Sequence, residues 1–290
     1  MTTRRPPQPT RRSLLAAGLL GWLQSVGAGP AAAAPSAQPW ARWAAHDNAN
    51  ASRVDHSTWS AFLTRHLKTD AHGINRVSYD LVSRAERAQL ATYIKHLERA
   101  DVDHLSRDEQ RAFWINLYNA LTVTTVIDHY PVASIRDIAI SPGWFSRGPW
   151  GAKLVQVAGE ALSLDDIEHR ILRPFWRDPR LHYALNCAAL GCPNLAKDAY
   201  EAATSEAMLD AAAHAFVNHP RGARIDRGRL FVSSIYVWYA DDFGTSDTAI
   251  VNHIKHYAGP DLLGRLAMID QISGDDYNWV LNDEATAHAG

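Results

Sequence analysis

Hydrophobic and polar residues follow each other with the spacing of helices along most of this chain and with the spacing of strands in a few segments. The clearest helical stretch runs from Ser106 to Pro131. Ser106 followed by Glu109 forms the capping-box pattern, in which two side chains satisfy free N–H groups at a helix start. Apolar residues then recur on one stripe, and Pro131 ends the run. We predict one long helix here, with the stripe facing a core.

Other segments divide into helical and strand-like patterns. Helical spacing occurs in HSTWSAFLTRHL, RAERAQLATYIKHLERA, LDDIEHRILR, AMLDAAAHAFVNH and AIVNHIKHYA, and a short aromatic helix is predicted in IYVWYADDFG. Hairpins are predicted in KLVQVAGEALSL, around Gly159, and in ARIDRGRLFVSS, around Gly228, and YNWVLND has a strand-like end. LHYALNCAA fits a buried strand or the entry to a helix. We predict an α+β fold, a helix-rich single domain over residues 56–290 around a small mixed or antiparallel sheet.

The N-terminal segment has the pattern of an export signal. Arg11 and Arg12 precede a short apolar run, and small residues follow up to Ala34. Paired arginines before leucines are typical of the twin-arginine type. The run is interrupted by glycines and is shorter than the roughly 20 residues that span a membrane. We therefore expect residues 1–34 to be a signal peptide without a stable membrane anchor, residues 35–55 to be a flexible lead-in, and the protein to be periplasmic or secreted.

Charge and composition limit the possible partners. Removal of residues 1–34 would take away four arginines and no acidic residue, which changes the formal net charge from −2 to −6. This balance disfavours a nucleic-acid partner, which would need a basic face. We expect no nucleic-acid partner and no cofactor, and a small molecule or peptide as substrate.

Two amides lie on the long predicted helix. Asn116 and Asn119 are three residues apart, so they share a helix face with apolar neighbours. A buried amide needs partners, because an unsatisfied one costs about 1–3 kcal/mol. These side chains either tie loops to the core or orient a catalytic group. For the second case we predict that Asn116 or Asn119 lies close to His169.

The only two cysteines, Cys187 and Cys192, lie five positions apart after His182. A disulfide fits the cysteine count of an exported protein, but it requires the two Cα atoms to come within about 7 Å, which only a turn or helical piece allows. A metal site is disfavoured, since zinc sites have closer pairs and four ligands. A nucleophile requires a thiolate, which a helix N-terminus or a paired histidine favours. We expect Cys187 at a strand-to-helix corner, with both thiols free.

Several segments together resemble the family of DUF547 proteins, defined by a domain of unknown function. They are FWINLYNALTV, SLDDIEHRILR, LHYALNCAALGCPNL, SSIYVWYADDFG and YNWVLND, and the chain resembles an exported bacterial member. The family pattern retains Glu168-His169 and Cys187, whereas Cys192 and His182 differ in plant-type members. The resemblance implies that Cys187 acts with His169, as in thiol hydrolases or transglutaminase-like enzymes. Histidine precedes cysteine here, so the order is permuted relative to papain-like enzymes.

We therefore predict a cysteine-dependent acyl-transfer enzyme (an amidase, a peptidase or a transglutaminase-like protein). Cys187 attacks a carbonyl, His169 carries the proton, and Glu168 or an asparagine orients the imidazole. Neighbouring helix residues point about 100° apart, so Glu168 and His169 would not both face one small site squarely. Binding residues are expected to be His182, Trp114 and Tyr118. Asp241 and Asp242 are interpreted as capping or loop residues, with a carboxylate at the site as the alternative. The alternative is a non-catalytic binding or structural module, in which the same residues form a packed polar core.

Overall fold

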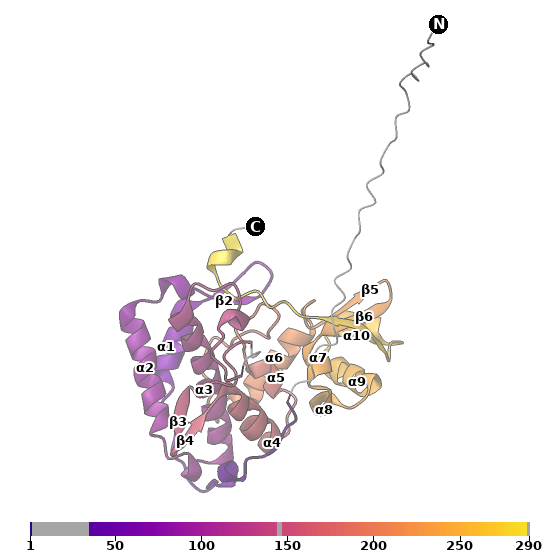
Figure 1. Ribbon diagram of the computed structural model, residues 1–290. Helices are drawn as coiled ribbons and strands as arrows, with labels where there is room; N and C mark the ends of the chain where they lie inside the picture. The colour runs from indigo at the N-terminus through magenta and orange to yellow at the C-terminus, as the bar shows by residue number, and fades with distance from the viewer. Residues whose placement is uncertain (2–34, 144–146, 289–290) are drawn as a thin grey trace. The chain divides into compact units, whose positions relative to one another are not determined.

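The structure is a computed structural model that describes residues 1, 35–143 and 147–288. The expected signal peptide, residues 1–34, lies outside the described residues apart from Met1. Helices dominate and the sheets are small, which confirms the α+β prediction (Figure 1).

The helices form two size classes. The longer ones are α1 (Ser57–His66), α2 (Arg84–Glu98), α3 (Arg107–His129), α6 (Ser205–Val217), α9 (Asp247–Tyr257) and α10 (Pro260–Leu266). The short α-helices are α4 (Arg173–Trp176), α5 (Leu181–Ala184), α7 (Ile235–Trp238) and α8 (Ala240–Phe243), and a π-helix, η5, spans Asp166–Leu172. The 3-10 helices are η1 (Ala41–Ala44), η2 (Tyr79–Leu81), η3 (Val102–His104), η4 (Ile135–Asp137) and η6 (Ala285–His288).

The seven strands of the described chain form three small sheets. Strands β1 (Leu67–Thr69) and β2 (Asn75–Val77) pair antiparallel, as do β3 (Val155–Val157) and β4 (Glu160–Leu162). In the third sheet, β6 (Arg229–Ser233) pairs antiparallel with β5 (Ala223–Asp226) and parallel with β7 (Ile272–Asp276). Both predicted hairpins are therefore confirmed. Their turns place Gly159 and Gly228 at positive φ, the region that glycine enters without steric cost.

Helix α3 is buried along most of its length and lies at the centre of the larger hydrophobic core. The hydroxyl of Ser106 accepts a hydrogen bond from the Glu109 N–H, as predicted. The Glu109 carboxylate, however, accepts a hydrogen bond from the Val54 N–H at 2.8 Å. Glu109 therefore ties the preceding segment to α3.

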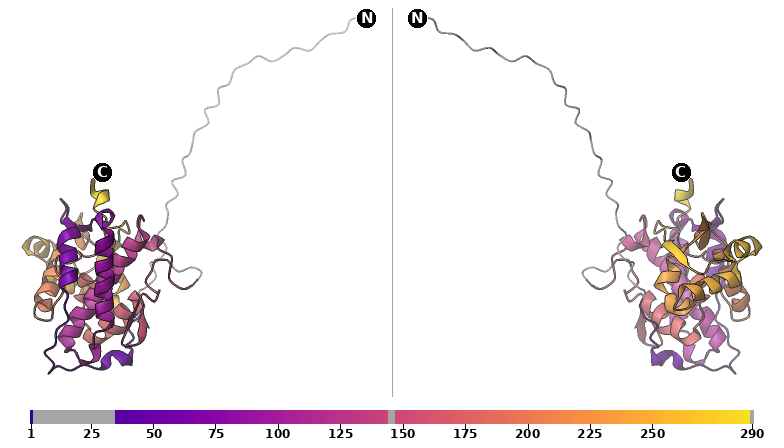
Figure 2. Two further views of the ribbon diagram at one scale, coloured as in Figure 1. Left: turned by 90° about the vertical axis from the view of Figure 1, so that its left-hand side faces the viewer. Right: turned by 90° about the vertical axis from the view of Figure 1, so that its right-hand side faces the viewer.

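A second hydrophobic core lies where α6 and α9 pack against the three-stranded sheet. Helices α1 and α2 lie on one side of the molecule, and α7 to α10 lie with β5–β7 on the other, as Figures 1 and 2 show. The C-terminal segment after β7 runs back towards β2, because Leu281 bridges to Ala189 in the turn after α5 and Asp283 bridges to Val77 at the end of β2. The strand-like pattern of YNWVLND thus corresponds to these isolated bridges.

Residues 35–55 differ from the expected flexible lead-in. The backbone N–H groups of Gln38 and Trp40 donate to the carbonyls of His169 and Arg170. Trp43 is buried, and its ring packs against the ring of Trp114 on α3, with 5.0 Å between the ring centroids. Trp43 therefore anchors the segment to the core, because an indole buried against α3 removes a large apolar surface from water, while most other residues of the segment are exposed.

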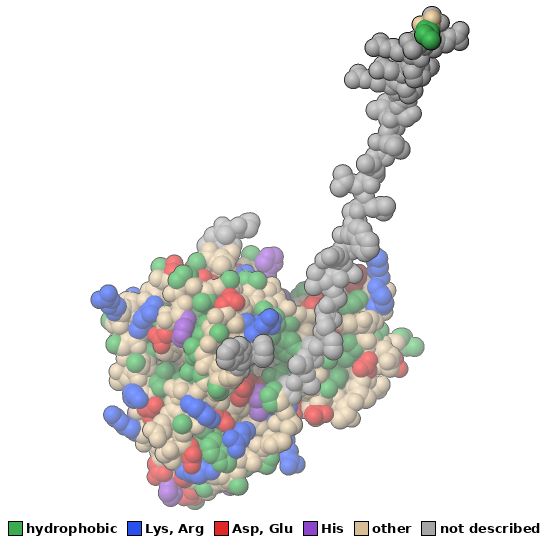
Figure 3. Space-filling model, viewed as in Figure 1, with side chains coloured by type: hydrophobic (Ala, Val, Ile, Leu, Met, Phe, Trp, Pro, Cys, Tyr) green, Lys and Arg blue, Asp and Glu red, His purple; other side chains and the backbone are tan. Residues whose placement is uncertain are grey.

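Among the described residues, no helix combines the length and the apolar character needed to cross a membrane. On the face that Figure 3 draws, Lys and Arg side chains are interspersed with Asp and Glu.

Candidate functional site

The two cysteines lie in a turn after α5. The helix ends at Ala184, and the Cys192 N–H donates to the Ala189 carbonyl while Ala188 adopts a positive φ of 59°. This turn brings the Cα atoms of Cys187 and Cys192 to 6.3 Å, and the structure joins the two residues in a disulfide. The expected free thiols and the expected strand-to-helix corner are therefore wrong. A straight strand would have separated the sulfurs, whereas the turn brings them together.

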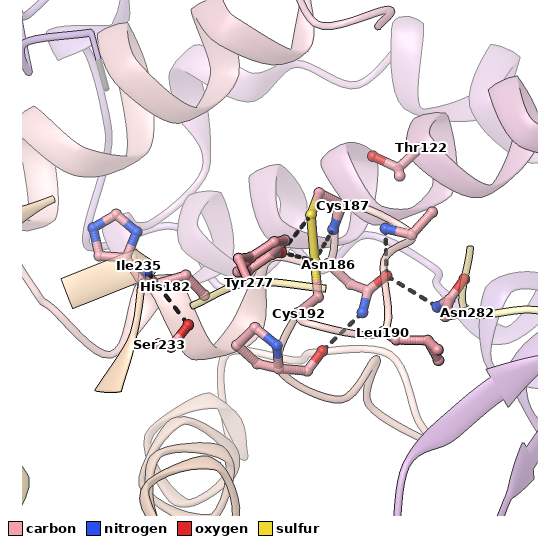
Figure 4. The surroundings of a disulfide bond; sticks show 12 residues. Thr122, His182, Asn186, Cys187, Leu190, Cys192, Ser233, Ile235, Tyr277 and Asn282 are labelled. Carbon is pink, nitrogen blue, oxygen red and sulfur yellow. Dashed lines mark hydrogen bonds between the residues drawn. A yellow bond between two sulfur atoms is a disulfide. The ribbon is translucent and has the colours of Figure 1, made fainter. Parts of the chain in front are cut away.

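Asn119 holds the backbone that leads into this turn. Its side-chain NH₂ donates to the Ala184 carbonyl, and its side-chain oxygen accepts from the Asn186 N–H, both at 2.9 Å. The Asn186 side chain in turn accepts from the Ala188 N–H and from the Asn282 amide, at 2.8 and 3.3 Å (Figure 4). The amides thus fix the position of Cys187.

Asn116 has a similar role at another loop. Its side chain donates to the Tyr200 carbonyl at 2.7 Å and accepts from the Tyr200 N–H at 2.9 Å. Both amides bond to backbone, and neither forms a hydrogen bond with His169. The idea that Asn116 or Asn119 orients the imidazole is therefore not supported, and the loop-tying alternative describes both side chains.

Tyr277 is the polar neighbour of both sulfurs. Its hydroxyl lies 3.0 Å from Sγ of Cys187 and 2.9 Å from Sγ of Cys192 (Figure 4). Burial raises the pKa of the phenol; the charge of Arg221 opposes the rise and that of Glu168 adds to it. The hydroxyl consequently stays protonated at neutral pH and can donate a hydrogen bond to sulfur. Its ring contacts those of Trp238 and Trp279, at 4.8 and 4.7 Å between centroids.

Glu168 is the centre of a buried cluster of ionisable groups. Its carboxylate oxygen lies 4.0 Å from Nδ1 of His169 and 3.9 Å from Nδ1 of His182. The hydroxyls of Tyr118 and Tyr239 also bond to this carboxylate. Glu168 and His169 are neighbours on the π-helix η5, and both are buried, at 6% and 5% exposure. Adjacent positions therefore do contribute to one cluster, contrary to the geometric objection raised from the sequence.

Asp242 closes the cluster on its outer side. Its carboxylate accepts hydrogen bonds from Nε2–H of His182 at 2.7 Å and from Nε–H of Arg173 at 2.5 Å. The interpretation of Asp242 as a mere capping or loop residue is therefore wrong. Asp241 beside it is exposed, but it lies within α8 and does not cap the helix. The sequence signal was the family-like segment SSIYVWYADDFG, which contains this carboxylate.

The carboxylates of the cluster remain ionised. Burial raises the pKa of Glu168, but the charges of His169 and His182 and a hydrogen bond from Tyr239 outweigh burial and lower it. Burial likewise raises the pKa of Asp242, but hydrogen bonds from His182 and Arg173 prevail and lower it to about 2. The phenol pKa values of Tyr118 and Tyr239 are raised by burial and by the nearby Glu168 charge. The cluster thus combines anions, imidazoles and protonated phenols.

The residues expected to bind substrate are distributed differently from the prediction. Trp114 is buried in the core against Trp43, so it presents no surface to a ligand. Tyr118 is buried next to Glu168. His182 is buried against the ring of Tyr239, with 4.1 Å between the two ring centroids. These two belong to the cluster itself.

His169 and Cys187 are not paired in this structure. Nη1 of Arg173 donates to Nδ1 of His169 at 3.1 Å, and Nε2 of His169 faces Asp165 at 3.6 Å. Within the described residues, the side-chain partners of the Cys187 sulfur are Cys192 and the Tyr277 hydroxyl. Figure 4 draws His182 in the surroundings of the disulfide, with the Tyr277 ring between imidazole and sulfurs in that view. Nowhere in the described chain do three or more His, Cys, Asp or Glu side chains gather as a metal site would require.

Residues 102–217 match the model of the family described as "Protein of unknown function, DUF547". The match supports the family that the sequence motifs indicate, and it includes α3, η5 and the cysteine turn. No curated protein and no solved structure matches the chain.

Proposed function

We propose that this protein is a cysteine-dependent acyl-transfer enzyme in which Cys187 is the nucleophile and the disulfide with Cys192 is a resting, oxidised form. The observation that carries the proposal is the cluster around Glu168, in which two imidazoles, one carboxylate and a guanidinium are buried beside the partly exposed carboxylate of Asp242. Burying charges costs free energy that apolar residues of the same volume would not incur. Ionisable groups concentrated in this way are typical of functional sites.

The chemistry starts with reduction of the disulfide. An external dithiol gives two electrons and two protons, which yields the Cys187 and Cys192 thiols and the oxidised form of the reductant. The Cys187 thiol then gives its proton to an imidazole of the cluster, and the resulting thiolate attacks a carbonyl carbon. When the acyl–leaving-group bond breaks, the imidazole returns this proton to the leaving group. Water or an amine releases the acyl group from sulfur.

The Tyr277 hydroxyl would link sulfur to the cluster. It lies within hydrogen-bonding distance of Cys187, and its pKa responds to the charge of Glu168. His182 is the imidazole that we now favour over His169. The reasons are that His169 is engaged by Arg173 and that His182 is held by Asp242, in the way that a carboxylate orients a catalytic imidazole.

A test uses p-nitrophenyl acetate, because thiol attack on its acyl group releases p-nitrophenolate, which can be measured. The natural substrate does not need to be known. Reduced protein should release a burst of p-nitrophenolate close to one equivalent, and oxidised protein should not. Cys192→Ser should give the burst without reductant, and Cys187→Ser should give none in either state. A burst that persists in Cys187→Ser, or none in reduced protein with two titrated thiols, would contradict the proposal.

The second candidate is a non-catalytic module that the disulfide stabilises. The observation in its favour is the pairing of the two cysteines, together with the amide network that fixes the turn. A bond that closes so short a loop stabilises a fold by about 2 kcal/mol in the chain-entropy model. In this case reduction should lower the free energy of unfolding by that amount, and it should produce no reactive thiol.

Export is part of the proposal. Processing near Ala34 would leave a chain that starts near Pro35, in a compartment that permits a disulfide. N-terminal sequencing of protein from an extracytoplasmic fraction tests this, and unprocessed protein in the cytosol would argue against it. Export that persists after Arg11→Lys and Arg12→Lys would indicate the general pathway.

A further inference from the structure

A cavity of about 330 Å³ opens beside α4 and α8, on the outer side of the cluster. Ala37, Pro39 and Pro174 form its apolar walls, and Asp242 connects it to His182. Cys187 does not line it. Ligand pockets measure about 300–1,000 Å³, so this cavity corresponds to a small molecule.

Most charged side chains of the cavity already have partners. Arg173 bonds to Asp242, and Asp178 bonds to Arg180, whose Nη2 donates to it at 2.6 Å. Arg177 and Asp241 also line the cavity, and both are exposed. In the described chain neither side chain takes part in an ion pair or a hydrogen bond. The cavity therefore offers one free cation and one free anion to a ligand.

These charges select between ligand classes. A purely anionic ligand would be repelled by Asp241 and by the neighbouring carboxylates Asp178 and Asp242. A purely cationic one would be repelled by Arg177 and Arg173. A ligand that carries one charge of each sign can pair with both free groups and place a small side chain against the proline and alanine walls. Such pairing fixes orientation, since opposite ends of the ligand meet opposite charges.

We propose that this cavity binds a small zwitterion, an amino acid or dipeptide with free termini, whose ammonium group faces Asp241 and whose carboxylate faces Arg177. The inference does not rest on the proposed acyl transfer, because the cavity is separate from Cys187. A ligand ammonium near Asp242 would also weaken the electrostatic field that this carboxylate exerts on His182. Ligand binding would therefore change the electrostatic environment of His182.

The experiment is calorimetric titration of oxidised protein with L-alanyl-L-alanine, its N-acetyl form and its C-terminal amide. Each modification removes one ligand charge and should weaken binding about fivefold, the equivalent of about 1 kcal/mol for a partly exposed ion pair. In Asp241→Asn the penalty for acetylation should disappear while the amide penalty remains. In Arg177→Gln the reverse should hold.

Matched controls are Arg84→Gln and Asp128→Asn, which remove exposed charges that do not line the cavity. Both should bind the three ligands as the wild type does, with unchanged circular dichroism for every variant. No measurable heat with any ligand at millimolar concentration would overturn the proposal. Equal affinity for free and capped ligands would overturn it as well. Because the protein stays oxidised, these results are independent of the p-nitrophenyl acetate burst.

Discussion

The Asp242 carboxylate accepts a hydrogen bond from Nε2–H of His182 at 2.7 Å, although 60 positions separate the two residues in the chain. The same oxygen accepts from Arg173, so one carboxylate links the helices that carry the histidine and the arginine. This relationship gives the cluster its outer boundary. It also makes Asp242 the residue whose removal is most informative.

Replacement of Asp242 by Asn should lower the free energy of unfolding by about 3 kcal/mol at neutral pH. The change leaves Arg173 buried without an anionic partner, and the figure is at the low end of the range because the carboxylate is partly exposed. The folded-state pKa is about 2, below the ordinary 3.8. The contribution is therefore present above pH 3.8 and is lost as the pH falls towards 2. Urea denaturation measures it, and Asp241→Asn is the control, with an expected change under about 0.5 kcal/mol.

Replacing either asparagine of α3 should lower the free energy of unfolding by a similar amount, but only one replacement should affect the labelling of Cys187. Asn116→Ala and Asn119→Ala each leave buried backbone groups without a partner, so each should cost about 2–4 kcal/mol. Only Asn119 fixes the backbone before Cys187. After reduction, iodoacetamide labelling of Cys187 should change in Asn119→Ala and stay at the wild-type rate in Asn116→Ala. Equal labelling in both variants would show that the turn does not depend on Asn119.

The lead-in segment should contribute to stability. Trp43→Ala removes an indole buried against Trp114 and should lower the free energy of unfolding by about 3–5 kcal/mol. Trp40→Ala, at a partly buried ring, should cost clearly less. Guanidinium titrations compare the two. A neutral effect of Trp43→Ala would mean that the segment is not held on α3 in solution.

The buried His56 and the half-buried His253 should make stability depend on pH. Burial lowers the pKa of His56 and of His253 to about 4, below the ordinary 6.5. The unfolded chain therefore binds more protons in this range, and stability should fall as the pH is lowered from 6.5 towards 4. Replacement of His253 by Gln should reduce that slope, whereas replacement of the exposed His46 should leave it unchanged. Unfolding curves at several pH values give the slope of the free energy of unfolding against pH. An unchanged slope in His253→Gln would show that His253 does not contribute to the pH dependence.

Tyr277→Phe keeps the ring and removes the hydroxyl beside the sulfurs. A protonated phenol stabilises a thiolate by donating to it, so the variant should raise the pKa of the reduced Cys187 thiol and slow its labelling near pH 7. The pH dependence of iodoacetamide labelling measures the shift. Tyr236→Phe, which removes a buried hydroxyl that is bonded to Tyr183, is the matched control and should leave the labelling profile unchanged. An identical profile for Tyr277→Phe and the wild type would mean that the phenol does not act on the thiol.

Features that depend on near neighbours in the chain could be predicted from the residues alone. The Ser106 cap, the hairpins at Gly159 and Gly228 and the long helix α3 follow from propensity and periodicity, which act over a few residues, whereas the burial of α3 on all its faces does not. Family-like motifs also indicated Glu168, His169 and Cys187 as residues of interest, and two of these lie in one buried cluster.

The contacts between residues that are distant in the chain could not be predicted in this way. The pairing of Cys187 with Cys192 depends on a turn that Asn119, on another helix, holds in place. The recruitment of Asp242 by His182 and Arg173 depends on how α8 packs beside α4 and α5. The burial of Trp43 depends on the surface that α3 presents. Contacts of this kind are set by the packing of whole elements and by the free energy of burying charge, neither of which a local pattern of residues encodes.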